Sequence, residues 1–235
     1  MQTTSPTPRK STASILVQGL LTFVLAGAVL GALLSLLAGK FSYWQVWAFA
    51  SLFALGTASQ GVYLSFLDPE LLERRKQVAP SAESPAERIF IIVGLVSTFG
   101  LMAFCALDLR FGWSHMPVWA SLLGDGLMIA SFLLYYLVFR VNSFASASIQ
   151  TYAGQKVIAS GPYARVRHPK YVGDLFLIVG TSLAIGSWWG LLLLVVSISA
   201  LAWRILDEER LLKKDLPGYV DYMQKVRYRL IPYLW

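Results

Sequence analysis

A group of basic side chains lies where a polar stretch of the sequence meets an apolar one. The stretch GPYARVRHPKYVGD, residues 161–174, contains four of them: Arg165, Arg167, His168 and Lys170. Pro169 disfavours helical backbone at His168 and suits the first turn of a helix, so the imidazole should be presented at a helix start. The free backbone amides and the positive dipole end of such a start favour an anionic group, such as a ligand carboxylate.

A second group of charged residues follows about thirty residues later, in the stretch WRILDEERLLKK, residues 203–214. Arg204 and Glu208 are four residues apart and share one helical face, which alone predicts only an ion pair of about 0.2–0.5 kcal/mol. Three consecutive carboxylates stand here: Asp207, Glu208 and Glu209. If the fold brings both stretches together, they would form a pocket for a ligand that carries both signs of charge.

The composition indicates an integral membrane protein. Hydrophobic residues make up 56% of the 235 residues and charged residues only 14%, whereas soluble domains carry about 25% charged residues. The mean hydropathy is +0.58. In such a chain a net charge of +7 is explained better by membrane topology than by nucleic-acid binding. The single cysteine, Cys105, excludes an intrachain disulfide.

Apolar runs of spanning length predict an all-α membrane fold with about six transmembrane helices. The first four runs are Ile15–Ala38, Tyr43–Leu67, Ile89–Leu107 and Val118–Phe139. The last apolar region, 171–203, is too long for one span and contains GSWWG at 186–190. Glycines and interfacial tryptophans in its middle predict a helical hairpin with its turn at the far membrane surface.

The distribution of basic residues fixes the expected topology. With the hairpin, all but two of the 20 lysines and arginines lie on one side of the membrane, the exceptions being Lys40 and Arg110. The positive-inside rule makes that side cytoplasmic, with both termini and the charged groups on it. We therefore expect a disordered arm over residues 1–14, a four-helix scaffold over 15–139, and a functional core over 140–235 that faces the cytoplasm. In a bacterium the protein would lie in the cytoplasmic membrane.

Several kinds of site are not indicated. Two histidines and one cysteine, widely separated, do not make an ordinary zinc site, and neither a G-x-S-x-G motif nor a phosphate-binding glycine loop is present. Asp125 is an ionisable group within the fourth predicted span, which makes it a functional candidate. The alternative, which we favour, is a structural role in which Asp125 hydrogen-bonds neighbouring helix ends.

Four motifs of the C-terminal part resemble a known enzyme family. In chain order they are SIQ, GQKVIASGPYARVRHPKYVG, RILDEERLL and GYVDYMQKVRYRLIP, with a hydrophobic hairpin between the second and the third. They are similar to the isoprenylcysteine carboxyl methyltransferase family and the related phospholipid and thiol methyltransferases. The resemblance covers about residues 140–235. It implies an integral membrane enzyme that transfers a methyl group from S-adenosylmethionine to a lipid-like or small-molecule acceptor. Membrane lipids would surround such an enzyme.

The resemblance also implies site residues. Cofactor-binding positions would be Gln150, Gln155, Lys156, Val157, Ile158, Tyr163, His168, Pro169, Lys170, Tyr171, Glu208 and Glu209. Arg204 matches a position assigned to the substrate, and His168 is a second candidate for a catalytic role. Gln155 stands where the eukaryotic carboxyl methyltransferases tend to have histidine, so a prenylated-protein substrate does not follow. If the acceptor is an amine or a thiol, a base is needed as well; the candidates are His168, Asp174 and Glu209.

Two other functions remain open. The segments YVGD and VRYRLIPYLW also resemble membrane sterol reductases, which use NADPH, and Asp174 favours that alternative. A non-enzymatic membrane protein or transporter would require the charged groups to serve only as anchors at the membrane surface.

Overall fold

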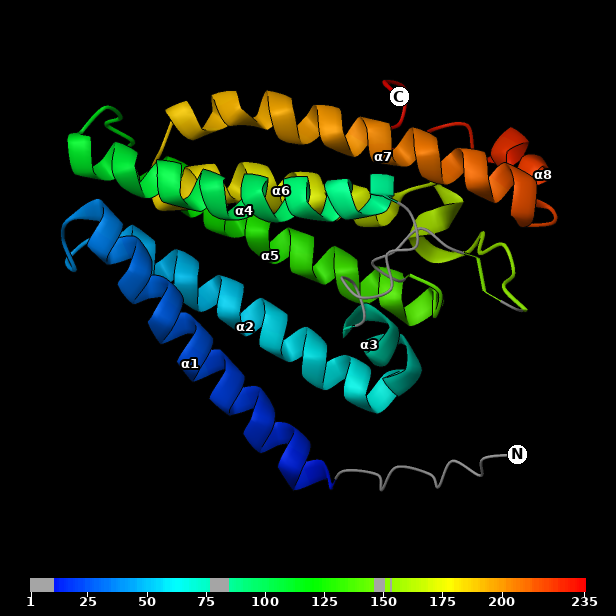
Figure 1. Cartoon of the computed structure of the whole chain (residues 1–235), viewed down its shortest axis with the longest axis horizontal. Coiled ribbons are helices and arrows are strands. Elements are labelled where there is room, and N and C mark those ends of the chain that lie inside the picture. The colour runs from blue at the N-terminus through cyan, green and yellow to red at the C-terminus, as the bar shows by residue number, and fades with distance from the viewer. Residues whose placement is uncertain (1–10, 77–84, 146–150, 153) are drawn as a thin grey trace.

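The chain folds into a bundle of helices, in a computed structural model that describes residues 11–76, 85–145, 151–152 and 154–235 (Figure 1). Within those residues all regular structure is helical, which confirms the predicted all-α class. The α-helices are α1 (Thr12–Ala38), α2 (Trp44–Leu67), α3 (Pro69–Lys76), α4 (Pro85–Phe111), α5 (Val118–Val141), α6 (Pro169–Ile185), α7 (Leu194–Asp215) and α8 (Tyr219–Lys225). Two short 3-10 helices are η1 (Gly161–Ala164) and η2 (Trp189–Leu193).

The first four predicted spans correspond to α1, α2, α4 and α5, with ends that differ by a few residues. α1 begins at Thr12, because Ser11 caps it by accepting a hydrogen bond from the Ser14 amide at 3.2 Å. Residues 12–14 of the predicted disordered arm are therefore helical. Residues 1–10 of that arm lie outside the described part of the chain.

The last apolar region forms the predicted hairpin. α6 ends at Gly186, whose φ of 103° is the left-handed conformation that glycine adopts at a helix C-terminus. After η2, α7 returns along α6 to the end of the bundle at which α6 began (Figure 1). Asp108 of α4, fully buried, fixes the turn because its carboxylate accepts hydrogen bonds from the Ser114 amide at 2.7 Å and from the Ser187 hydroxyl.

Five of the described helical segments are long and apolar enough to cross a membrane: α1, α2, the 92–111 part of α4, α5 and the continuous segment 189–215. α6 has 17 residues and so measures about 25 Å, somewhat less than a hydrocarbon core of about 30 Å. The integral membrane class is supported, whereas six spans with cytoplasmic termini stay a prediction.

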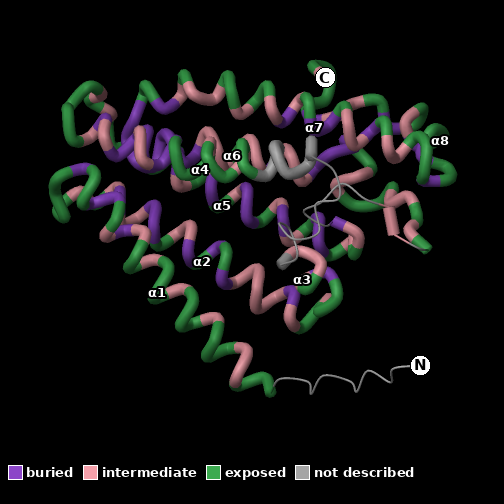
Figure 2. The backbone as a smooth tube through the Cα atoms, in the orientation of Figure 1, coloured by how far each residue is buried: buried purple, intermediate pink, exposed green. Residues whose placement is uncertain are grey.

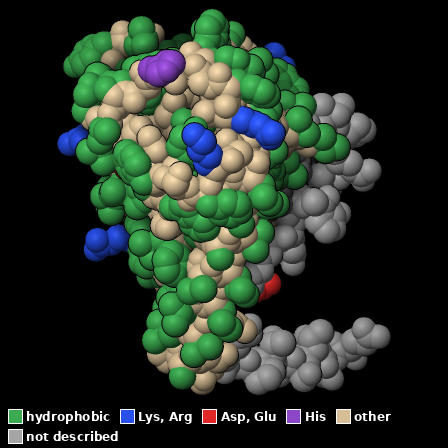
Figure 3. Space-filling view, turned by 90° about the vertical axis from the view of Figure 1, so that its left-hand side faces the viewer, with side chains coloured by type: hydrophobic (Ala, Val, Ile, Leu, Met, Phe, Trp, Pro, Cys, Tyr) green, Lys and Arg blue, Asp and Glu red, His purple; other side chains and the backbone are tan. Residues whose placement is uncertain are grey.

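The two ends of the bundle differ. The α3 and α8 helices and the segment before α6 lie at one end, and the turns after α1, α4 and α6 lie at the other (Figure 1). The surface at the end that carries the turns after α1, α4 and α6 is mainly hydrophobic, with a histidine and a few basic side chains (Figure 3). The structure thus places α3, α8 and the basic segment 161–174 at one common end, as the charge pattern predicted.

The core lies where α5 packs along α6, and buried residues concentrate on these helices and on α2, while α1 and α7 turn large apolar side chains outward (Figure 2). Close approach is possible because glycines occupy the contact. A Cβ built on Gly124 would lie 2.3 Å from the Ala184 amide nitrogen, and one on Gly180 would lie 2.9 Å from the Gly124 carbonyl oxygen. Small residues allow membrane helices to approach in this way. α5, from the predicted scaffold, thus packs directly on α6, from the predicted functional core, and the boundary between them at residue 140 stays a prediction.

Replacing Gly124 with alanine should destabilise the protein, because the added methyl group meets backbone atoms that cannot move aside. We expect a loss of about 1–3 kcal/mol, the usual cost of overpacking, measured as a lower thermal unfolding midpoint in detergent. Gly126→Ala is the matched control, since nothing lies within 4 Å of its Cβ position and alanine favours a helix. Equal midpoints for the two variants would contradict the proposed close contact.

Candidate functional site

A buried cluster of charges joins three segments at the α8 end of the bundle. Glu209 of α7 is 1% exposed, and its Oε1 accepts a hydrogen bond from Arg167 Nε at 2.7 Å. The same oxygen lies 3.3 Å from His168 Nε2. Its Oε2 accepts a hydrogen bond from Arg229 Nε, in the C-terminal tail, at 3.1 Å. One carboxylate thus holds α7, the start of α6 and the tail together.

The backbone strengthens this arrangement. The amides of Arg167 and His168 donate to the carbonyls of Tyr228 and Arg229, each at 2.9 Å. The Arg167 guanidinium also donates to the Val226 carbonyl at 2.9 Å. His168 is the N-cap residue of α6, followed directly by Pro169, as the sequence predicted. Its ring therefore has a fixed position at the helix start.

A cavity with about 870 Å³ of open space, including the part that faces solvent, lies beside this cluster. All of its described lining comes from the C-terminal part of the chain: Asn142, Phe144, Ala145, Gln155, Lys156, Val157, Ile158, Tyr163, Arg167, His168, Lys170, Tyr171, Arg204, Glu208, Leu211, Leu212, Leu216, Tyr219 and Tyr222. We call it the polar cavity.

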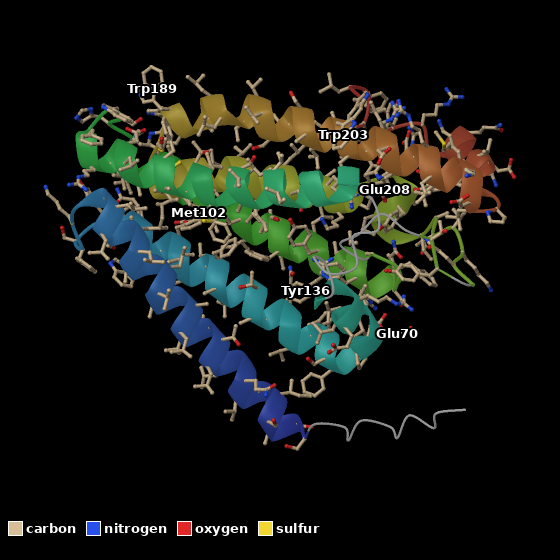
Figure 4. All side chains as sticks on the ribbon, in the orientation of Figure 1. Glu70, Met102, Tyr136, Trp189, Trp203 and Glu208 are labelled. Atoms are coloured by element: carbon tan, nitrogen blue, oxygen red, sulfur yellow. The ribbon has the colours of Figure 1, made fainter. Side chains whose placement is uncertain are left out.

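The two charged stretches meet at this cavity. The Tyr171 hydroxyl of α6 donates a hydrogen bond to Glu208 Oε2 of α7 at 2.6 Å. Arg204, 4% exposed, lies near enough to interact electrostatically with the same hydroxyl. Glu208 is labelled in Figure 4, on the half of α7 nearer to α8. A carboxylate, a guanidinium and a phenol therefore line one wall of the cavity.

Tyrosines form a second wall. The Tyr163 hydroxyl accepts a hydrogen bond from Asn142 Nδ2 at 2.7 Å, and the Tyr163 carbonyl accepts one from the Tyr222 hydroxyl at 2.8 Å. The Tyr219 hydroxyl is buried and has no hydrogen-bond partner among the described residues. Burial raises the pKa of Tyr163 and Tyr219 above the ordinary value for tyrosine and that of Tyr222 to about 12. All three phenols are therefore protonated near neutral pH.

Gln155 shapes the loop that closes the cavity, because its side-chain Oε1 accepts a hydrogen bond from the Tyr152 amide at 2.9 Å. Arg74 of α3 reaches this loop from the scaffold half, with its guanidinium 4.4 Å from the centre of the Tyr152 ring. Arg75 donates a hydrogen bond to the carbonyl of Ala145, a lining residue, at 3.0 Å. Thus α3 supports the site, although the sequence offered no sign that it would.

The structure brings most of the predicted site residues to one place. Ten of them line the polar cavity: Gln155, Lys156, Val157, Ile158, Tyr163, His168, Lys170, Tyr171, Arg204 and Glu208. Pro169, the first residue of α6, is not part of the described lining. Glu209 is not part of it either, because its side chain points into the buried charge cluster. Gln150 lies outside the described residues. The binding roles of these residues stay predictions.

Asp125 and Asp174 do not line the polar cavity. Asp125 lies in the second turn of α5, whose first residue is Val118 at the opposite end of the bundle from Asn142. Asp174 faces a different cavity between helices and accepts hydrogen bonds from the Tyr135 hydroxyl and, at 2.8 Å, from Lys170 Nζ.

Sequence reasoning missed the contribution of α8 and of the corner after α5. Tyr219 and Tyr222 are three residues apart and so lie on one helical face, directly after Gly218 with its φ of 82°. That spacing was a usable signal. Asn142 and Phe144 gave none, because their place at the cavity depends on how α5 ends against η1.

Comparison with known proteins supports the resemblance seen in the motifs. The model of the phospholipid methyltransferase family matches residues 119–216. The match therefore begins in α5, earlier than the motifs indicated, and ends just after α7. It includes the hairpin and both charged stretches.

Among solved structures, the chain resembles the eukaryotic intramembrane Ras methyltransferase ICMT, an isoprenylcysteine carboxyl methyltransferase. The TM-score is 0.56 at 23% identity, over 81% of this chain and 67% of that chain, which shows a shared fold. The chain is also 34% identical over 91 residues to the mouse delta(14)-sterol reductase TM7SF2. That similarity covers 37% of this chain and only 22% of the reductase.

Glu208 and Glu209 offer a test of the two roles that the geometry gives them. Glu209→Gln should lower the free energy of unfolding by about 3–5 kcal/mol, because Arg167 and Arg229 lose their counter-charge in a buried cluster. That loss corresponds to a drop of about 6–20 °C in the unfolding midpoint. Glu208→Gln, next to it, should change the midpoint much less because Glu208 borders an open cavity. A Glu209→Gln protein as stable as the parent would show that the cluster does not hold the site together.

Proposed function

We propose that this protein is an integral membrane methyltransferase that uses S-adenosylmethionine and acts on a lipid-like or small-molecule acceptor. The observation that carries the proposal is the polar cavity, where the matched hairpin and its two charged stretches converge beside the Glu209 cluster. The fold shared with ICMT and the family match support it.

The lining of the polar cavity fits this cofactor chemically. S-adenosylmethionine carries an ammonium, a carboxylate and a sulfonium cation beside an aromatic base. The cavity offers the Glu208 carboxylate for an ammonium, the Lys156 cation for a carboxylate, and tyrosine rings whose faces attract cations. The buried Tyr219 hydroxyl without a described partner is a hydrogen-bond donor that such a ligand would satisfy.

When bound, the cofactor supplies a methyl group on a positively charged sulfur. The residues of this chain would act by holding the reactants in line and shaping the electric field around them. Glu208 and Lys156 would bind the polar ends of the cofactor. Arg204, close to Glu208 on the same wall, would orient the acceptor, and His168 would stay fixed by Glu209 as part of the cavity wall.

The location of the site in the cell belongs to the same proposal. The polar cavity lies at the end of the bundle to which the positive-inside rule assigns the cytoplasm. A soluble cofactor would enter from that side, and a lipid-like acceptor would approach between the helices.

The sterol reductase similarity favours a second candidate, an oxidoreductase that uses NADPH, the alternative to which the segment YVGD with Asp174 also pointed. The similarity covers 22% of the reductase, whereas the methyltransferase fold extends over 81% of this chain. A non-enzymatic membrane protein, whose charged residues serve only as anchors at the membrane surface, would not need the polar cavity.

Titration with S-adenosylhomocysteine and with NADPH, followed by thermal unfolding in detergent, separates the two enzymes. At a hundredfold excess over its dissociation constant, a ligand stabilises the folded state by about 2.7 kcal/mol, or about 5–11 °C in a protein of this size. We expect that shift with S-adenosylhomocysteine and none with NADPH. The reverse pattern would replace the methyltransferase proposal with the reductase, and transfer of labelled methyl groups to a lipid extract would then identify the acceptor.

Tyr219→Phe provides a sharper test, because the expected effects on stability and on binding differ in direction. Removing a buried hydroxyl that has no partner should leave the free protein as stable or make it more stable. The same change should weaken S-adenosylhomocysteine binding about two- to tenfold, the worth of one hydrogen bond. Tyr222→Phe is the control, since it removes a bond to the Tyr163 carbonyl and should lower stability. Unchanged affinity in Tyr219→Phe would exclude this hydroxyl as a ligand contact.

A further inference from the structure

A second cavity lies between α4, α6 and α7, inside the apolar part of the bundle. It encloses about 820 Å³ of open space, including its open side. Its described lining is apolar or bears only hydroxyls, apart from Asp174. Met102, labelled in Figure 4, lies on its wall. We call it the apolar cavity.

The two cavities adjoin along the hairpin. On α6, Lys170 lines the polar cavity and Asp174 the apolar cavity, four residues further from the α8 end. On α7, which runs the other way, Arg204 lines the polar cavity and Leu201 the apolar cavity, again on the side away from α8. On each helix, the residue that lines one cavity is therefore about 4.5–6 Å along the helix axis from the residue that lines the other. The apolar cavity therefore continues the polar cavity toward the opposite end of the bundle.

Asp174 lies where the two cavities adjoin and is bonded to residues of α5 and α6. Its Oδ2 lies 2.8 Å from the Lys170 ammonium, and its Oδ1 accepts a hydrogen bond from the Tyr135 hydroxyl of α5. Arg75 of α3 interacts with it electrostatically. The side chain of Asp174 retains 24% exposure, so a molecule in the apolar cavity can reach it.

The structure also narrows the choice of base. Among the three candidates, His168 and Glu209 contact each other within the buried charge cluster, where Glu209 also holds two arginines. Neither His168 nor Glu209 lines the apolar cavity, whereas Asp174 does, although it too has contacts with Lys170 and Tyr135. Asp174 remains as the candidate that faces a cavity able to hold an apolar molecule.

We propose that the apolar cavity binds the apolar part of the methyl acceptor and that Asp174 receives the proton which the acceptor loses. This inference rests on the proposed function and deepens it, because it makes the acceptor an amine or a thiol. The acceptor's nitrogen or sulfur forms a bond to the transferred methyl carbon while the bond between that carbon and the donor sulfur breaks, its electron pair staying on that sulfur. The N–H or S–H proton passes to the Asp174 carboxylate. A carboxylate acceptor has no proton to give at neutral pH and would meet a like charge at Asp174.

Three probes with the same eight-carbon chain test the class of acceptor: octylamine, octanethiol and octanoate. In the cofactor-free protein, octylamine and octanethiol should raise the unfolding midpoint and octanoate should not. Ala200→Phe fills the apolar cavity from α7 and should abolish these shifts, whereas Ser199→Phe, on the exposed side of the same helix, should preserve them. A shift with octanoate alone, or equal shifts in both phenylalanine variants, would overturn the inference.

Asp174→Asn tests the proton transfer with octanethiol as the probe. At pH 7 methyl transfer should fall about 100-fold or more, the usual contribution of a positioned base, while affinity for S-adenosylhomocysteine stays within about twofold. Transfer should recover as the pH rises through the pKa of the thiol, because a thiolate needs no base. An undiminished rate at pH 7, or a loss that no pH restores, would overturn the role of Asp174.

The outcomes distinguish this inference from the function on which it rests. If S-adenosylhomocysteine does not bind and a lipid extract accepts no methyl group, the methyltransferase proposal itself fails. If S-adenosylhomocysteine binds and the extract is methylated, but the eight-carbon probes neither bind nor react, only the assignment of the apolar cavity and Asp174 fails.

Discussion

The structure of the site depends on the buried carboxylate of Glu209. Three cationic or ionisable side chains converge on it from segments that are far apart in the sequence: Arg167, His168 and Arg229. A charge buried in this way must be compensated, because the cost of removing it from water is several kcal/mol. That requirement forces α7, the start of α6 and the C-terminal tail into one arrangement. The position of Tyr171 in the first turn of α6, and hence its bond to Glu208, follows from that arrangement.

Neighbouring residues on α7 therefore have separate tasks. Successive side chains on an α-helix point about 100° apart, so Glu208 borders the polar cavity while Glu209 points into the charge cluster. The sequence DEE suggested a group of carboxylates that act together. The structure instead divides Glu208 and Glu209 between lining the polar cavity and holding the charge cluster. The same division places the His168 ring against Glu209 on one side and against Tyr171 on another, with ring centroids 5.6 Å apart.

Much of the fold was predictable from the sequence, because length, hydropathy and basic residues are local signals. The hairpin followed from GSWWG and from the basic residues after Trp203, and ten predicted residues meet at one cavity for that reason. The contributions of Arg74, Asn142 and Phe144 were not predictable in this way. Each depends on where a helix ends against another segment, and hydropathy carries no information about such contacts. That Glu209, and not Glu208, lies outside the cavity lining was not predictable for a related reason: the sequence shows that two glutamates are adjacent, but not which one becomes buried.

The unequal lengths of α6 and α7 explain why a cavity exists at this end of the bundle. α6 ends and α7 begins at the same turn, but α6 has 17 residues and α7 has 22, which makes α7 longer by about 7–8 Å. The last turn of α7, with about half of the turn before it, therefore extends beyond the start of α6 and has no helix of equal length beside it. This space is bordered by the loop that precedes α6 and by the helix α8. Tyrosines and charged side chains line it. Farther along the same two helices, where α4 replaces these segments as the third wall, the lining is apolar or bears only hydroxyls, except for Asp174. One hairpin with unequal arms thus produces a polar cavity and an apolar cavity in line, which is the arrangement that a soluble methyl donor and a lipid-like acceptor would require.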